Sequence, residues 1–287
     1  MVISHNMAAM FASRQVNLVN EHVQTDAAKL SSGERITKAA DDPSNLSIST
    51  KMRAQISGLN RASKNIQDAS SLVQTTDGYL NEITDVVQRI RELAVQAGNG
   101  VYQQEERQMM QVEVSQLISE ISRISSQASF NGMNLLSGRF DAEKGTEALQ
   151  FTIGANTDQR ISLNISSMTA ESLGFRGNEQ SDVTPISLES TESANASIAT
   201  IDEALKKINI QRADLGAAQS KLEFGKQGID IAAENLQASE SRIRDVDVAQ
   251  AFVDFAKDEI LQSSSSAMLA QAININRDSV ARLFGNI

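Results

Sequence analysis

The sequence predicts a mainly α-helical protein built as a long antiparallel coiled-coil rod, and three observations carry this prediction. Branched aliphatic residues recur at strict seven-residue spacing, which is typical of one stripe on a coiled-coil helix. Only 4% of the 287 residues are aromatic, and a compact globular core usually has more. Pro occurs only at Pro43 and Pro185, so helices can run uninterrupted over long stretches. The seam, as we call the stripe, consists of Ile201, Ile208, Leu215, Leu222, Ile229, Leu236 and Ile243.

The seam needs a partner helix. Residues three positions after its members are mostly small, such as Ala204 and Ala218, and small side chains let a second helix approach closely. Burying seven aliphatic side chains contributes roughly 10–20 kcal/mol before the ordering entropy is subtracted. We expect the seam helix to span residues about 192–244 and to pack against the chain's own earlier helices.

The main expected partner is a helix over residues about 43–98. Asp42 can cap its start, Pro43 suits the first helical position, and Gly98-Asn99-Gly100 ends it. A helix of this length extends roughly 80 Å at 1.5 Å per residue, which suits a rod. Its apolar stripe includes Ile56, Leu59, Ile66, Val73, Leu80, Val87 and Ile90.

A third helix is expected over residues about 103–129, antiparallel to the second because the link between them is short and Gly-rich. Residues about 135–185 change character, and Leu149, Phe151 and Ile153 alternate with polar residues, as does the stretch from Ile161 to Ile165. This alternation predicts a small β-hairpin region on the rod. The polar stretch at about 175–195 predicts a surface loop.

The two ends of the chain predict weak helices, at about 4–38 and 247–284. Their apolar stripes are sparse, so each helix should be marginal without a partner. Because the weak helices flank the strong ones symmetrically, we expect them to pair with each other.

Composition excludes several functions. The net charge of −10 argues against a nucleic-acid partner, which would need clustered Lys and Arg. The absence of Cys excludes disulfides and thiolate metal sites. The first residues lack the features of a secretory signal peptide, and no stretch approaches 18 consecutive apolar residues, so no membrane insertion is expected. If the protein leaves the cell, a dedicated exporter must recognise it.

No catalytic residue, metal site or cofactor is predicted. His5 and His22 are far apart, whereas a metal site needs three or four convergent ligands. Asp41 and Asp42 suit capping and helix-junction roles better than acid–base catalysis. No nucleotide-binding or hydrolase motif appears. An enzyme is therefore the least favoured class, and the absence of membrane spans speaks against a helical signalling module such as a chemoreceptor hairpin.

Several motifs in order resemble bacterial flagellin, over roughly residues 1–140 and 195–287. The motifs are Leu30-Ser31-Ser32-Gly33-Glu34-Arg35-Ile36, Ala40-Asp41-Asp42-Pro43-Ser44-Asn45-Leu46, Gln88-Arg89-Ile90-Arg91-Glu92-Leu93-Ala94-Val95-Gln96, Phe130-Asn131-Gly132, Glu234-Asn235-Leu236-Gln237-Ala238-Ser239-Glu240-Ser241-Arg242-Ile243-Arg244-Asp245 and Met268-Leu269-Ala270-Gln271-Ala272. The first six residues and the stretches 99–102 and 113–116 are most similar to spirochaete core flagellins.

This resemblance implies a structural subunit of the flagellar filament that polymerises head to tail into a helical propeller. Residues 1–42 and 245–287 would form an inner-core domain of paired terminal helices, and 43–244 the rod domain. Only about fifty residues separate the matching halves, so no large outer domains are expected. The filament would be secreted as part of the flagellum, and periplasmic if the spirochaete likeness holds. A flagellin-like hook–filament junction protein is the alternative.

The resemblance also implies partners besides other copies of the chain. These are an export chaperone, the flagellar type III export apparatus, the filament cap, hook-associated proteins and, around some filaments, sheath proteins. Arg89, Leu93 and Glu113 match positions recognised by the flagellin-sensing Toll-like receptor of the host, and their simpler role is contact between subunits. The expected chaperone and polymerisation residues of the C-terminus are Phe252, Phe255, Ile260, Met268, Leu269, Leu283 and Phe284.

Overall fold

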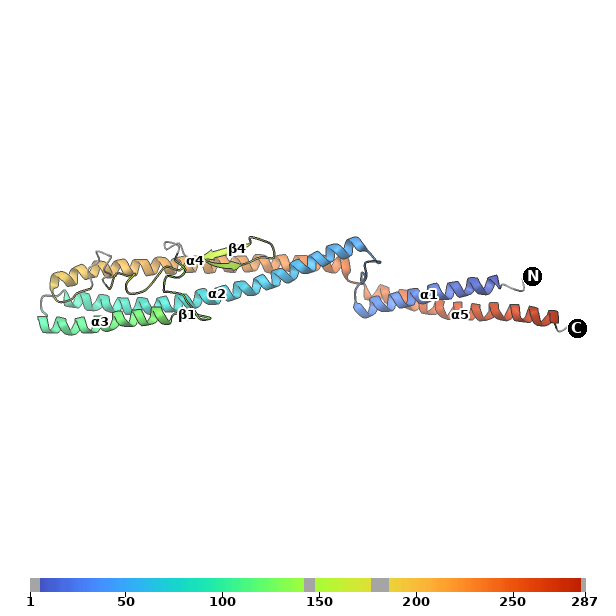
Figure 1. Cartoon of the computed structure of the whole chain (residues 1–287), viewed down its shortest axis with the longest axis horizontal. Coiled ribbons are helices and arrows are strands. Elements are labelled where there is room, and N and C mark those ends of the chain that lie inside the picture. Colours follow the sequence, from blue (N-terminus) through green and yellow to red (C-terminus); the bar gives the residue numbers. More distant parts are fainter. Residues whose placement is uncertain (1–5, 142–147, 177–185, 285–287) are drawn as a thin grey trace. The chain divides into compact units, whose positions relative to one another are not determined.

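The computed structural model describes residues 6–141, 148–176 and 186–284, and these are mainly helical (Figure 1). The helices are α1 (Met7–Ser32), α2 (Pro43–Ala97), α3 (Gln104–Gln127), α4 (Thr191–Arg244) and α5 (Val248–Phe284). Two antiparallel strand pairs join β1 (Ser129–Phe130) to β2 (Met133–Asn134) and β3 (Leu149–Thr152) to β4 (Arg160–Leu163). The predicted fold class is confirmed.

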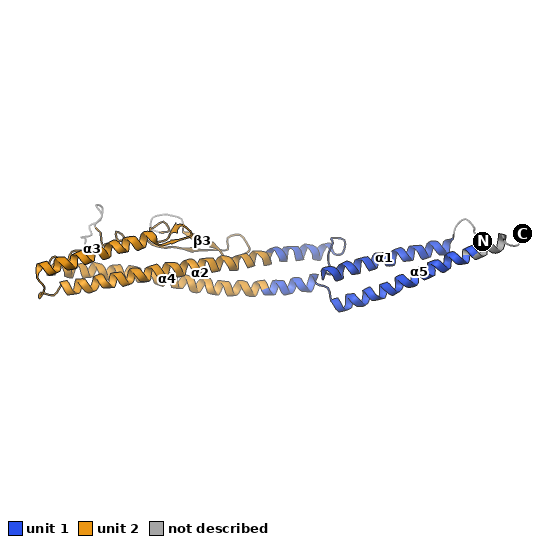
Figure 2. Ribbon diagram, turned by 90° about the horizontal axis from the view of Figure 1, so that it is seen from below, with its two compact units in different colours: residues 1–54, 234–287 blue, residues 55–233 orange. Residues whose placement is uncertain are grey.

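The chain divides into two units, which are coloured separately in Figure 2. Unit 1 comprises residues 1–54 and 234–287, and unit 2 comprises residues 55–233. Unit 1 contains α1, α5 and the adjoining ends of α2 and α4. Unit 2 contains α3, the strands and the longer parts of α2 and α4.

Unit 2 is a helical bundle in which the seam is buried against α2. Ile201, Ile208, Leu215 and Leu222 are at most 2% exposed, and they belong to one apolar core with Leu80, Ile121 and other residues of α2 and α3. The buried α2 members of the predicted stripe are Ile66, Val73, Leu80, Val87 and Ile90. The seam therefore packs on the chain's own second helix with α3 alongside, as the sequence predicts. The remaining stripe residues Ile56, Leu59, Ile229, Leu236 and Ile243 are half-buried.

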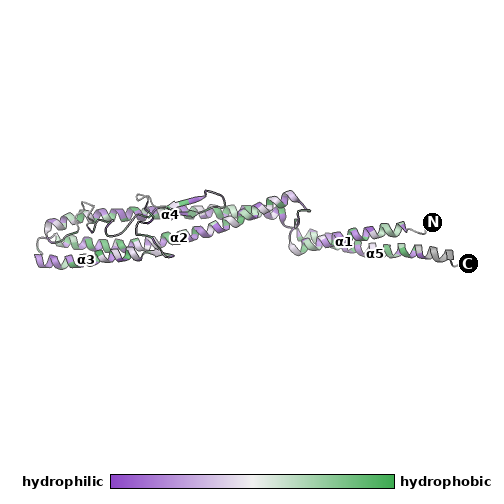
Figure 3. Cartoon of the chain, in the orientation of Figure 1, coloured by the Kyte–Doolittle hydropathy of each residue, from purple (hydrophilic) through white to green (hydrophobic). Residues whose placement is uncertain are grey.

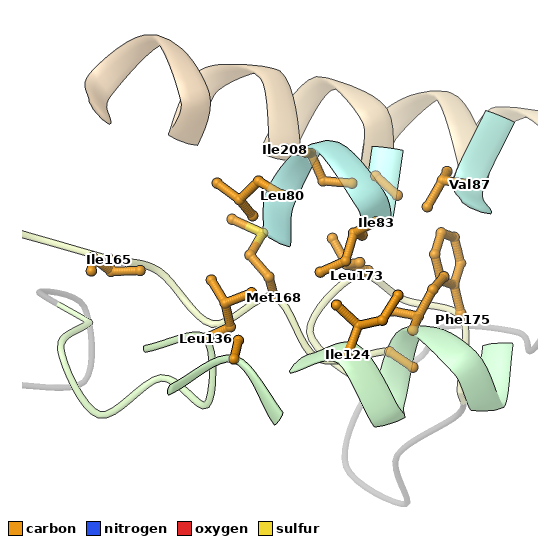
Figure 4. Close-up of a cluster of buried hydrophobic side chains, with 14 of the residues drawn as sticks. Leu80, Ile83, Val87, Ile124, Leu136, Ile165, Met168, Leu173, Phe175 and Ile208 are labelled. Atoms are coloured by element: carbon orange, nitrogen blue, oxygen red, sulfur yellow. The ribbon is translucent and has the colours of Figure 1, made fainter. Parts of the chain in front are cut away.

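The segment between α3 and α4 completes this core. Leu136, Ile165 and Met168 come from it, and their side chains gather with Leu80 and Ile83 of α2 (Figure 4). Further along the segment, Leu173 and Phe175 lie near Val87 and Ile124 in the same cluster. The segment between α3 and α4 thus contributes large apolar side chains to the core of unit 2.

The prediction of a surface loop at about 175–195 is wrong at both ends of that stretch. Phe175, Ile186 and Leu188 are buried, because they fill the space beside α3 and α4. The Gln111 side chain on α3 accepts a hydrogen bond from the Leu188 backbone N (2.7 Å) and donates one to the Ile186 carbonyl (3.2 Å). Residues 177–185, in the middle of the predicted loop, lie outside the described residues.

The predicted hairpin is present and its turn rests on α2. Phe151 pairs with Ile161 in the β3–β4 register. A Cβ on Gly58 of α2 would lie 2.8 Å from the Ala155 Cβ in the turn, so this close approach requires glycine. Asn65 of α2 also donates a hydrogen bond to the Thr152 carbonyl (3.2 Å). The hairpin is therefore fixed to the outside of the bundle.

The helix ends in unit 1 follow local capping rules. The Asp42 carboxylate accepts a hydrogen bond from the Asn45 backbone N (3.0 Å), which caps α2 as predicted and lowers the pKa of Asp42. Helix α1 ends at Gly33, whose φ of 71° is left-handed and whose N–H donates to the Lys29 carbonyl (2.8 Å). The first helix is accordingly shorter than the predicted span of about 4–38.

Candidate assembly surfaces

Helices α1 and α5 lie side by side as an antiparallel pair (Figures 1 and 2). The Asn6 side chain donates to the Ala272 carbonyl (3.1 Å) at one end of the pair. Nearer the middle, the Gln262 side chain donates to that of Asn20 (2.5 Å). The predicted pairing of the weak terminal helices is confirmed.

This terminal pair leaves most of its apolar side chains exposed. Phe11 is 66% exposed and Met268 is 64% exposed, and both line a groove of about 710 Å³ between the two helices. Apolar residues lie along both helices in Figure 3. Among described residues of the pair, only Val19 and Ala251 are buried apolar side chains. Exposed apolar surface of this extent is typical of a site of interaction with another molecule.

The predicted C-terminal residues divide into two groups. Phe252, Ile260 and Met268 are exposed, whereas Phe255 and Leu269 are half-buried. The side chains of Leu283 and Phe284 lie outside the described residues. The exposed group is therefore available to a partner.

An ion-pair network joins the two chain connections of unit 1, and it was not predicted from the sequence. We call it the junction network: Glu34, Arg53, Glu240 and Arg244. The Glu34 carboxylate accepts hydrogen bonds from Arg244 (2.9 Å) and Arg53 (2.6 Å), and Arg53 also bonds Glu240 (2.8 Å). The bonds from Arg244 and Arg53 lower the pKa of Glu34. The network joins residues that are far apart in the sequence, so no regular spacing of residues predicts it.

Backbone hydrogen bonds strengthen the same junction. The N–H of Arg35 donates to the Arg244 carbonyl (2.6 Å), and that of Val246 donates to the Gly33 carbonyl (3.0 Å). Ile36, which follows Arg35 in the sequence, is 1% exposed. The α1–α2 and α4–α5 connections are thus paired like a very short antiparallel ladder.

The structure brings Arg89 and Glu113 together on the surface of unit 2. Their side chains form an ion pair at 2.9 Å, which raises the pKa of Arg89, and both are about half exposed. The expectation that Leu93 shares an exposed surface with Arg89 and Glu113 is wrong. Leu93 is 2% exposed and belongs to the core of unit 2. It follows Ile90 and precedes Ala97 at helical spacing, and both of these are fully buried.

The structure describes one of the two histidines considered in the sequence. His22 is mostly exposed, with its Nδ1 4.0 Å from an Asp258 carboxylate oxygen, and His5 lies outside the described residues. In the part of the chain that the structure describes, no cluster of three or more His, Asp or Glu residues is arranged to hold a metal ion. None of the helices described there combines the length and apolar character that crossing a bilayer requires.

Family comparisons agree with this architecture. The family model for the bacterial flagellin N-terminal helical region matches residues 3–141, and the one for the C-terminal helical region matches residues 198–284. This chain belongs to the bacterial flagellin family. Flagellins are structural subunits of the flagellar filament and are not enzymes, so the predicted function and class are confirmed.

Two relatives named as filament core proteins support the same assignment. The flagellar filament 33 kDa core protein of Treponema phagedenis is 55% identical over 276 residues, covering 95% of this chain and 96% of the relative. A flagellar filament core protein of Brachyspira hyodysenteriae is 47% identical, covering 96% and 98% respectively. The solved structure of Bacillus cereus flagellin covers 58% of this chain and 88% of its own, at 27% identity and a TM-score of 0.48. Filament proteins among these relatives favour a filament subunit over a hook–filament junction protein.

Proposed function

We propose that this flagellin polymerises head to tail through the exposed apolar surface of the α1–α5 pair. The observation that carries the proposal is the groove containing Phe11 and Met268, which the chain itself leaves uncovered. Contacts between different patches on successive copies do not close, so they propagate into a helical polymer. In the filament, each terminal pair would be covered by the pairs of neighbouring subunits.

Folding of the terminal pair would be coupled to this assembly. Its few buried apolar side chains offset little of the conformational entropy lost on ordering two helices. The terminal helices would therefore be largely disordered in the free subunit and would fold when neighbours cover them. This restricts polymerisation to the growing end of a filament. It also supports a division into an inner-core domain at residues 1–42 and 245–287 and a rod domain at residues 43–244.

Export partners would use the same exposed residues before assembly. A cytoplasmic chaperone covering Phe252, Ile260 and Met268, together with the half-buried Phe255 and Leu269, would keep the subunit unpolymerised. The flagellar type III export apparatus would deliver the subunit. The filament cap and hook-associated proteins would lie at the ends of the filament. The exposure of these apolar side chains supports a protective partner.

A periplasmic location is also proposed, from the likeness to the Treponema and Brachyspira relatives. Their likeness supports a filament that rotates in the periplasm, where sheath proteins would surround the core. A filament kept inside the envelope would not display the rod surface to a host.

Recognition by a Toll-like receptor would depend on Arg89 and Glu113, since Leu93 is buried. A receptor-reporter assay comparing purified subunits with the variants Arg89→Ala and Glu113→Ala tests it. Loss of signalling in both variants supports recognition, and equal signalling in all three contradicts it.

Polymerisation is tested by deleting residues 250–287, which removes most of α5. Seeded assembly, followed by electron microscopy, should give long filaments from the full chain and none from the truncated chain. Circular dichroism of the truncated chain should retain the helicity of α2, α3 and α4, because their core lies in unit 2. Filaments from the truncated chain would contradict the proposal.

A further inference from the structure

Methionine is concentrated among the exposed apolar side chains of the α1–α5 pair. The whole chain has nine Met residues. Four of those that the structure describes are strongly exposed, and three of the four belong to this pair: Met7 is 67%, Met10 is 54% and Met268 is 64% exposed. The fourth, Met109, is 71% exposed and lies on α3 in unit 2. The terminal pair therefore carries most of the exposed thioether groups in the described residues.

These thioethers lie in and around the groove between the two helices. Met268 lines the groove from α5, and Phe11 lines it from α1. Met7 lies four residues before Phe11, on the same side of α1. The hydrogen bond from Asn6 to the Ala272 carbonyl places the start of α1 beside the turn of α5 that follows Met268. The surface that the proposed function assigns to assembly is thus rich in methionine.

A thioether differs from the other apolar groups on this surface because a mild oxidant changes it. A peroxide transfers one oxygen atom to the sulfur: the O–O bond breaks, an S–O bond forms, and the peroxide is reduced to water or an alcohol. The sulfur loses two electrons and becomes a sulfoxide. Side chains such as Phe252 and Ile260 do not react in this way. Because the chain has no Cys and no Trp, methionine is its most readily oxidised residue type.

Oxidation would affect assembly far more than it would affect the free subunit. A sulfoxide is a polar group that accepts hydrogen bonds, and in the free subunit it stays in contact with water. Covering it in an apolar contact removes those hydrogen bonds, which is unfavourable. The groove is lined mainly by apolar surface, so a sulfoxide at Met268 would oppose the covering of the groove by a neighbour.

We propose that Met268, together with Met7 and Met10, is a reversible oxidation site through which peroxides withdraw free subunits from assembly. This site deepens the proposed function and rests on it, because neighbouring subunits must cover the terminal pair. An oxidised subunit would not be added to a filament, whereas subunits already in a filament would keep their thioethers covered. Methionine sulfoxide reductases would return the oxidised subunit to the pool that can assemble.

Partial oxidation of the unmodified sequence tests the site without any variant. Free subunits are treated with hydrogen peroxide until they carry less than one sulfoxide per chain on average, the peroxide is removed, and filament seeds are added. Sedimentation separates filaments from residual subunits, and mass spectrometry measures the sulfoxide at each Met in both fractions. Met268 sulfoxide should be at least tenfold rarer in the filaments, and Met109 sulfoxide should differ by less than twofold. If Met268 sulfoxide is no more depleted than Met109 sulfoxide, the inference is wrong.

Leucine variants give a matched comparison, because Leu has nearly the volume of Met and no thioether. The triple variant Met7→Leu, Met10→Leu, Met268→Leu removes the proposed site, and Met109→Leu removes the exposed thioether outside it. Each protein is compared with its own unoxidised form. The same peroxide treatment should raise the critical concentration of the parent and of Met109→Leu at least tenfold, and that of the triple variant less than twofold. Methionine sulfoxide reductases with a thiol reductant should reverse the effect in the parent.

The outcomes separate this inference from the proposed function. If the unoxidised parent does not polymerise, the proposed function fails and the inference fails with it. If the unoxidised parent polymerises and the oxidised parent elongates equally well with Met268 converted to sulfoxide, only the inference fails. If the triple variant does not elongate even before oxidation, the sedimentation experiment decides, because it uses the parent sequence alone.

Discussion

The two units of this flagellin differ in where they keep their apolar side chains. Within the described residues, unit 2 holds all buried apolar side chains except three, namely Val19, Ile36 and Ala251 of unit 1. Of the twenty large apolar side chains that are exposed among the described residues, unit 1 holds thirteen. Both units consist mainly of paired helices, so helical pairing alone does not decide stability. Unit 2 has the third layer that closes its core, whereas under the proposed function other subunits supply that layer to unit 1.

The strongest test of this contrast is a cavity in the core of unit 2. Ile83 is fully buried among α2, α3 and the segment that follows, so Ile83→Ala should destabilise the free subunit by about 2–5 kcal/mol. Urea unfolding followed by circular dichroism measures this. Ile260→Ala is the control, because Ile260 is 70% exposed and its loss should cost less than about 0.5 kcal/mol. If Ile83→Ala and Ile260→Ala lower the free energy of unfolding equally, the core of unit 2 is not what stabilises the free subunit.

A smaller effect is expected at the junction network. Glu34→Gln removes the carboxylate that accepts hydrogen bonds from Arg244 and Arg53. The local stability of the junction should fall by about 1–1.5 kcal/mol. Hydrogen exchange at the Arg35 and Val246 amides should therefore become roughly tenfold faster. The measurement belongs in filaments, because the proposed assembly folds unit 1. Glu234→Gln, a change at an exposed carboxylate of α4, is the control.

The junction should also depend on pH in one direction. The pKa of Glu34 is lowered in the folded state, so its contribution is complete above the pKa of an unfolded Glu. It is lost as the pH falls through this lowered folded-state pKa. The difference in exchange between parent and Glu34→Gln filaments should therefore shrink in acid. A difference that grows in acid would show that the carboxylate is not held as its ionised form.

A substitution in the groove between α1 and α5 should have the smallest effect on the stability of the free subunit and a large effect on assembly. Met268→Glu replaces an exposed side chain, so the unfolding free energy should change by less than about 0.5 kcal/mol. Filament elongation should nevertheless stop, because the charge would be buried between subunits. Exposed Gln271 on the same groove provides the control Gln271→Ala, which should still elongate. If Met268→Glu subunits elongate normally, the groove is not an assembly surface.

The sequence predicts the parts of the fold that depend on local or periodic signals. The seven-residue seam identifies α4 and its need for a partner, and Asp42-Pro43 identifies the start of α2, because periodicity and capping are written in neighbouring residues. The pairing of α1 and α5 is predicted instead from their symmetric positions on either side of the strong helices. Residues 149–163 form the expected hairpin because alternation has a period of two.

The remaining features depend on packing between distant segments. Phe175 and Leu188 are single apolar residues near a polar stretch, and nothing periodic shows that they are buried. Leu93 shares a helix turn with the exposed Arg89, so only the position of α3 decides which of the two faces the core. The junction network brings Glu34 beside Arg244 across most of the chain, and charged residues are common in helices without such partners.

Hydrogen exchange of the free subunit and of the filament, compared helix by helix, tests the central claim most directly. The amides of α2, α3 and α4 within unit 2 should exchange slowly in both states, since their core is complete in one chain. The amides of α1 and α5 should exchange rapidly in the free subunit and become at least a hundredfold slower in the filament. Slow exchange of α1 and α5 in the free subunit would contradict the claim that other subunits complete the terminal pair.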